Sequence, residues 1–466
     1  MSVDAPPAPL PSGPSNVSRR VVLRRDNRAA GAASGAGQSI GGASAVLIGS
    51  SFASSAIGLL YWLVAARSLS PAQLGLDAAV INTVMLASNL GSLDLVHAVP
   101  RYLPAAGNRA AAFVRTSYGV AVGLSLLVAA VFLVGVRTWT PSLTYLVDEL
   151  AWTALFLLAV MAWSTFALQD CVLIGLRRSN WVPIENVVFS VLKLVLLLVL
   201  VEVAPRYAVL LSWTLPALLF VAIVNLGVVR RAVRPTADTR PVSLPSRGRL
   251  TRTVLVGNGA NIAGIVVAGT LPLLITERFG AEANASYFLA WSMAYVLFLA
   301  PRYVSLVVLS RAEHQPEQLD DITLRATLAS TALVGVAALV ALVLARPVLG
   351  MVGSAYQNDA VGLLQLMSLA AVPHCAVVMA AAWARGRQRI ALAVVVSIAE
   401  YVAMIGFALL FVGRMGMMGF GWAWLAGETL AAVVLAGVAW RTRRIDSALV
   451  RNALAARRAP NAPASN

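Results

Sequence analysis

The chain has 466 residues, of which 59% are hydrophobic and only 12% are charged, whereas an average soluble domain carries about 25% charged residues. A water-soluble globule of this composition would expose large apolar patches, so a soluble enzyme, a DNA-binding protein and a disordered chain are excluded for the whole molecule. We interpret the net charge of +16 as loop charge of a membrane protein, which needs no nucleic-acid partner.

The two ends of the chain differ in composition from the rest. Residues 1–42 are rich in Pro, Ser, Gly, Ala and Arg and lack the apolar core of a signal peptide. We therefore expect 1–42 to be a disordered basic cytoplasmic tail. Residues 442–466 are similarly rich in Arg and Ala and are expected to form a second basic cytoplasmic tail.

Apolar segments long enough to span a membrane lie between these tails. A span needs about 20 apolar residues, and its backbone must be helical unless it belongs to a closed barrel. The segments lack the alternating pattern of barrel strands, so the sequence predicts an all-α polytopic membrane protein with about 12 transmembrane helices. The segments are 43–66, 73–96, 110–134, 151–176, 181–203, 208–229, 253–275, 283–309, 324–345, 359–383, 390–412 and 416–440.

Arginines concentrate in the tails and in every second connection between these segments. The positive-inside rule then predicts an inner (plasma) membrane protein with both termini in the cytoplasm. The basic linker 230–252 divides the chain into a six-helix lobe over 43–229 and another over 253–441. The loops contain no Gly-rich phosphate-binding motif, so we expect no ATPase domain and no cofactor.

Three stretches carry a resemblance to a known family. ARSLSPAQLGLDAAVINTVMLASNLGSLDLVHAVPRYLP resembles the first helical hairpin of the polysaccharide-flippase family, within the multidrug/oligosaccharidyl-lipid/polysaccharide exporter superfamily. CVLIGLRRSNWVPIENVVFSVLKLVLLLVL is similar to its helix 4–5 hairpin, and VLGMVGSAYQNDAVGLLQLMSLAAVPHCAVVMAAAWARGRQRI to its helix 10 region. The resemblance implies a MATE-like flippase fold, two six-helix lobes around a central cavity, and transport of lipid-linked glycans by alternating access.

Ionisable residues inside spans are costly and are functional candidates by default. Lys193 lies near the middle of its helix, and Arg302 follows Pro301 nearer the cytoplasmic end of another. We expect both to face the cavity and to bind the phosphate of a lipid-linked sugar, because guanidinium and ammonium groups both suit that anion. A structural partner for a carboxylate or a carbonyl is the alternative.

Further polar side chains are candidates for supporting roles. Asn82 and Asn89 share a helix face, as do Asn258 and Asn261, and these amides could bind sugar hydroxyls or join helices. Glu400 and Glu428 are interpreted as ion-coupling groups or as counter-charges to the two cations.

Other polar residues are expected to be structural. His374 has no second His or Cys at metal-ligand spacing, so we expect it to pack in its helix and predict no metal site. Asp170 and Glu185 lie close in sequence to Arg177 and Arg178 and are expected to form interfacial salt bridges with them.

The leading hypothesis is a non-enzymatic flippase for a lipid-linked oligosaccharide or polysaccharide precursor. Its expected partners are that glycan, membrane lipids and possible polysaccharide polymerases or glycosyltransferases. A cation-coupled multidrug antiporter of the same superfamily is the first alternative. A polytopic glycosyltransferase or ligase is a weaker one, because the outer loops are short and offer no His. A non-transporting membrane scaffold also stays open.

Overall fold

The computed structural model describes residues 49, 53–92, 95–232 and 247–458, with side chains left undescribed at 247–261, 263, 313–314 and 390 and from 439 onward. The expected tail 1–42 therefore lies outside the described residues. Within them the chain is all-helical and contains no strand, which confirms the predicted all-α class. An apolar segment in lipid must satisfy its backbone hydrogen bonds within itself, and the α-helix does so.

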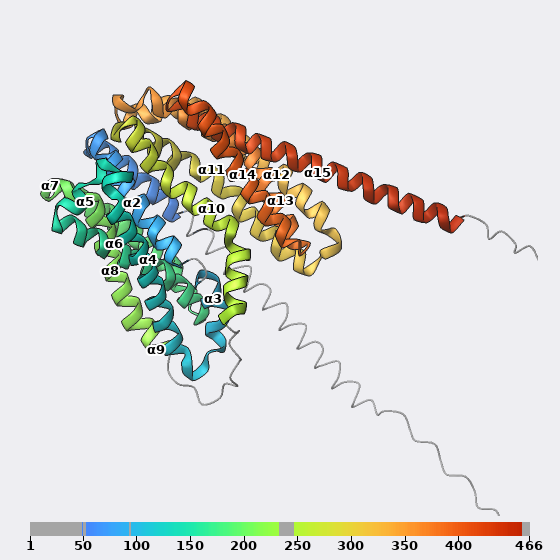
Figure 1. Ribbon diagram of the computed structural model, residues 1–466, viewed down its shortest axis with the longest axis horizontal. Coiled ribbons are helices and arrows are strands. Elements are labelled where there is room, and N and C mark those ends of the chain that lie inside the picture. Colours follow the sequence, from blue (N-terminus) through green and yellow to red (C-terminus); the bar gives the residue numbers. More distant parts are fainter. Residues whose placement is uncertain (1–48, 50–52, 93–94, 233–246, 459–466) are drawn as a thin grey trace, which may run out of the picture.

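The first half of the chain forms the N-terminal bundle, shown in blue to green in Figure 1. It consists of a helix over 53–68 followed by the helices up to η5, which pack on one another. Their bounds are α2 (Pro71–Ser92), α3 (Leu95–Tyr102), η1 (Leu103–Ala105), η2 (Gly107–Arg109), α4 (Ala110–Trp139), η3 (Pro141–Leu143), α5 (Tyr145–Asp148), α6 (Leu150–Gly175), α7 (Trp181–Val203), η4 (Pro205–Tyr207), α8 (Ala208–Val224) and η5 (Asn225–Val229).

The second half forms the C-terminal bundle, which follows the short α9 (Arg230–Ala232). Within it α11 packs on α13, α13 on α12 and α15, and α14 on α15. The bounds are α10 (Arg247–Phe279), α11 (Ala281–His314), η6 (Pro316–Gln318), α12 (Leu319–Val352), η7 (Ser354–Tyr356), α13 (Asp359–Gly386), α14 (Ile390–Met415) and α15 (Met418–Arg458).

Ten helical segments in the described residues are long and apolar enough to cross a membrane. The helix over 53–68 and α10 correspond to the two remaining predicted spans, so the count of about 12 is compatible with the structure. The fold is that of a multi-pass membrane protein.

Two helices extend further than the hydrophobic pattern predicts. α10 begins at Arg247, inside the predicted linker, and α15 continues to Arg458 through most of the predicted basic tail. Hydrophobicity marks the part of a helix that lies in lipid, whereas Arg, Ala and Leu have high helix propensity and can continue a helix beyond it.

The bundles meet at one end, which we call the closed end, where α2 packs against α10 and α11. There the Asn284 amide donates to the Gly75 carbonyl at 2.8 Å, and Arg67 donates to the Met351 carbonyl at 2.7 Å. The backbone N–H of Ser142 donates to Glu277 at 3.0 Å. Figure 1 shows the bundles meeting in its upper part, with the N-terminal bundle extending down to α9 and the C-terminal bundle extending to the right. By the positive-inside prediction, the closed end is the outer one.

Gly75 makes the close contact at this end possible. A Cβ added to it would lie 1.7 Å from the Ala281 carbonyl oxygen, at the start of α11. Backbone atoms cannot yield that much space, so only glycine allows α2 and α11 to approach so closely.

Candidate functional site

Lys193 lies inside the N-terminal bundle and is only 5% exposed. Its Nζ is 4.0 Å from the ring centroid of Trp213 on α8, 5.0 Å from that of Tyr61 and 5.5 Å from that of Phe189. The Tyr61 and Ser212 hydroxyls are 2.7 Å apart and hydrogen-bonded, which fixes one of these rings. A desolvated cation over an aromatic face gains about 2 kcal/mol.

Aromatic rings surround the Lys193 ammonium, and we call them the aromatic cage. Lys193 takes part in none of the ion pairs that the structure gives for the residues it describes. Burying a charge without a counter-ion costs free energy. Such a residue inside a membrane span is therefore a candidate for binding a ligand or an ion.

A small apolar pocket adjoins the cage, between α2, α6 and α8. Trp213 contributes to both features, so one wall of the pocket also covers the Lys193 ammonium. The pocket is lined by Ile81, Val84, Met85, Ala159, Trp163, Leu210, Trp213, Thr214 and Ala217.

Arg302 lies in the other bundle, on α11, and its side chain is exposed. It is within electrostatic reach of Arg385 in the last turn of α13 and of Tyr401 on α14. The structure therefore places the two predicted cations in different bundles and different surroundings, one enclosed and one exposed.

The two predicted asparagines on α2 lie in different surroundings. Asn82 is half-buried and donates to the Ala78 carbonyl of its own helix at 2.8 Å, while Asn89 is exposed. Asn258 and Asn261 lie on α10, but their side chains are outside the described residues.

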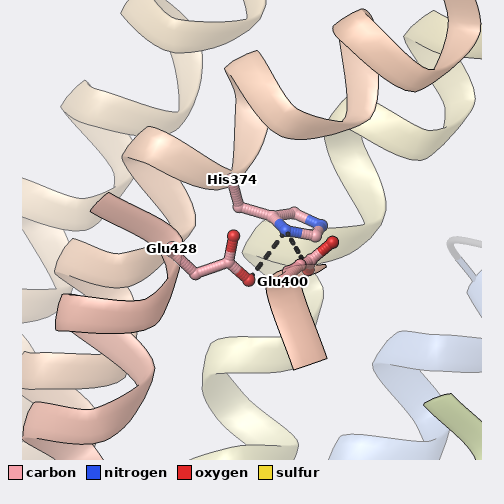
Figure 2. A group of neighbouring side chains, drawn as sticks. All are labelled: His374, Glu400 and Glu428. Atoms are coloured by element: carbon pink, nitrogen blue, oxygen red, sulfur yellow. Dashed lines mark hydrogen bonds and ion pairs between the residues drawn. The ribbon is translucent and has the colours of Figure 1, made fainter. Parts of the chain in front are cut away.

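Three polar side chains meet inside the C-terminal bundle, and we call them the His–Glu cluster: His374 on α13, Glu400 on α14 and Glu428 on α15 (Figure 2). The His374 Nδ1 lies 3.0 Å from the Glu428 Oε1 and 3.5 Å from the Glu400 Oε1. The side chains are 14%, 12% and 2% exposed for His374, Glu400 and Glu428.

The His–Glu cluster has two acidic groups but only one group that can carry a positive charge. If both carboxylates are ionised, one imidazolium balances only one of them, and the second Glu428 oxygen, Oε2, is buried without a hydrogen-bond partner. One imidazole nitrogen and two carboxylate oxygens lie within 4.8 Å of one another, a set that could hold a proton or a metal ion.

The sequence interpretation of these residues was partly wrong. His374 is not merely packed in its helix, because it is the side chain that joins the two glutamates. In the structure Glu400 and Glu428 face His374, and their ion pairs are with it rather than with Lys193 or Arg302. The available signal was the similar depth of three ionisable residues in three successive predicted spans.

The predicted salt bridges of Asp170 and Glu185 are also contradicted. Their hydrogen-bond donors are the amides of Asn186 and Gln169, not Arg177 or Arg178, which are exposed. Arg177 adopts a positive φ of 58° in the turn after α6.

No family model matches the chain, and no curated protein matches it. Solved structures do. The chain resembles an inward-facing MATE family multidrug resistance transporter of the MOP superfamily, with TM-score 0.59, 19% identity, and coverage of 85% of this chain and 95% of that one. A MOP superfamily transporter from Pyrococcus furiosus, described by a reversed polarity of its binding pocket, gives TM-score 0.59, 18% identity and coverage of 87% and 96%. An outward-facing MATE family transporter gives TM-score 0.52 at 18% identity, with coverage of 87% and 96%.

These likenesses establish the class of fold, which is the two-bundle helical fold of MATE transporters. At such low identity they establish the fold alone.

Proposed function

We propose that the chain is a membrane exporter that works by alternating access and moves an anionic lipid-linked glycan precursor across the inner membrane. The hydrogen bonds at the closed end support alternating access, because they join the bundles at one end only, where a rocking motion can break them. Transport, rather than catalysis, is also the activity named for the structures that share the fold.

The buried Lys193 ammonium is the observation that carries the choice of substrate. An enclosed cation that forms no ion pair with the acids in the described part of the chain favours a phosphate or pyrophosphate over a cationic drug. The adjoining apolar pocket suits an apolar part of the same substrate. Arg302, exposed on the other bundle, offers a second contact for the anion.

Depletion of the protein tests the proposal directly. Lipid extracts of depleted cells should accumulate a glycan-lipid on the cytoplasmic face, and surface polymer should disappear. Re-expression of the natural chain should reverse both changes. Unchanged glycan-lipids on depletion, at a confirmed loss of the protein, would show that the substrate is something else.

A cation-coupled multidrug antiporter is the second candidate, and the His–Glu cluster favours it. A buried site that lacks one positive charge can take up a proton or a metal cation from one side and release it to the other. Drug efflux by proteoliposomes that responds to an imposed pH or Na⁺ gradient, and that Glu428→Gln abolishes, would support this candidate over the flippase.

A further inference from the structure

A second buried polar cluster lies inside the N-terminal bundle, where α6 ends and α7 begins. Gln169 Nε2 donates to Glu185 Oε1, and Asn186 Nδ2 donates to Asp170 Oδ2 at 3.0 Å, so two neighbouring links join the helices. Asn225 Nδ2 donates to Gln169 Oε1 at 2.5 Å. Asn225 begins η5, a π-helical turn of a kind that is frequent at functional sites.

The two acids of this cluster each keep an unpaired oxygen. Glu185 is only 1% exposed, and its Oε2 is buried without a hydrogen-bond partner. The same holds for Asp170 Oδ1. A buried polar atom that lacks a partner costs about 1–3 kcal/mol, and more when it is charged, so such an atom marks a place where an ion or water belongs.

No cationic side chain compensates these acids in the described part of the chain. Neither Asp170 nor Glu185 takes part in an ion pair among the described residues. Both acids act electrostatically on Tyr118 of α4, whose hydroxyl is buried. Cys171 is also within electrostatic reach of Asp170. The adjacent α3 carries His97 and Arg101, but both are exposed.

We propose that Asp170 and Glu185 form a cation-binding site that takes one positive charge, either a proton or an alkali ion such as Na⁺. Two neighbouring carboxylates in a buried site cannot both stay ionised without a positive charge between them. Oxygen is the ligand that hard cations prefer, and the free oxygens come from Asp170 and Glu185, with the Tyr118 hydroxyl beside them. A cation bound there ties α4, α6 and α7 together.

This site is separate from the His–Glu cluster, which lies in the other bundle, and it does not depend on the transported substrate. The cation stabilises the folded protein because it binds only when the helices bring both acids together. Removing one acid should therefore remove the response to the cation without removing the fold, since glutamine and asparagine keep the size of the acids they replace.

Thermal unfolding of the full-length purified protein, followed by tryptophan fluorescence, tests this site. Na⁺ is titrated against choline at constant ionic strength and pH 8, and a second series varies pH without Na⁺. The variants are Glu185→Gln and Asp170→Asn. Glu202→Gln is the matched control, because it is the same substitution on the same helix at an exposed position. Glu428→Gln reports on the His–Glu cluster alone.

We expect Na⁺ or acid to raise the Tm of the natural protein by a few degrees, and Glu185→Gln and Asp170→Asn to reduce that shift. Glu202→Gln should keep the whole shift, and Glu428→Gln should keep the part due to this site. A shift with Na⁺ at pH 8 identifies an alkali ion, and a shift with acid alone identifies a proton. Equal shifts in the natural protein, Glu185→Gln and Asp170→Asn overturn the proposal and leave water as the occupant of the two unpaired oxygens.

Discussion

Lys193 is the only lysine in the chain, and it lies among aromatic rings and outside the ion pairs of the residues that the structure describes. Such an arrangement stabilises the ammonium only in part, because rings do not replace the hydration that burial removes. Under the proposed function, an anionic substrate that binds next to Lys193 would offset this residual cost.

Replacing this lysine separates stability from transport. Lys193→Met removes a buried charge and keeps the apolar stem, so we expect an equal or higher Tm and a fall in export of at least about tenfold, which corresponds to 1.4 kcal/mol. Lys193→Arg keeps the charge and should keep more export than Lys193→Met. Surface glycan and Tm are measured at matched protein abundance. Full export by Lys193→Met would remove this residue from the substrate site.

The His–Glu cluster predicts a pH-dependent variant. His374→Gln removes the group between two carboxylates, which then repel each other when both are ionised. We expect its Tm to fall relative to the natural protein as pH rises from 5 to 8, since ionisation of the carboxyl groups increases with pH. The double variant His374→Gln/Glu428→Gln carries one acid fewer and should lose most of that dependence. Parallel Tm profiles for all three proteins would contradict this account.

At the scale of elements, the contact of α2 with α11 depends on Gly75, because any side chain there would collide with α11. Gly75→Val places atoms where the Ala281 carbonyl oxygen now lies, so the helices must separate at the closed end. We expect the variant to favour a conformation open at this end. A cysteine at Asn284, which is fully buried and bonded to the Gly75 carbonyl, should then react faster with a water-soluble maleimide.

Gly123→Val is the control for this experiment, because a Cβ at Gly123 on α4 meets no atom within 4 Å. Labelling of the Asn284→Cys protein should be as slow with Gly123→Val as with the natural glycine. Equally slow labelling in the Gly75→Val background would mean that α2 and α11 accommodate the valine without opening. The two natural cysteines, Cys171 and Cys375, are buried and give a low background.

At the scale of the whole molecule, the distribution of arginine predicts the orientation in the membrane. We expect a fluorescent-protein fusion at the C-terminus to fluoresce and an alkaline-phosphatase fusion there to be inactive, because the C-terminal region is Arg-rich. A phosphatase inserted after Pro141, in the connection between α4 and α6, should be active. The opposite pattern at both positions would invert the topology and place the closed end at the cytoplasmic face.

The sequence was sufficient for the helices but not for the polar contacts. The span predicted over 181–203 coincides with α7, because the hydrophobic run and the Pro and Arg residues that flank it are local properties. The partners of Glu428 were misjudged, because its nearest charged neighbour, His374, is 54 residues away in sequence. Hydropathy shows that a residue lies in a span, but it does not show which neighbouring helix the residue faces.

The sequence by itself therefore determined the membrane class, the all-helical fold and the approximate number of spans, because lipid requires each segment to satisfy its own backbone and to be apolar. The tertiary structure alone decided that Lys193 lies among rings, that His374 joins two glutamates, and that Asp170 and Glu185 accept hydrogen bonds from side-chain amides. These features depend on the rotation and contact of helices far apart in the chain, which packing between side chains sets.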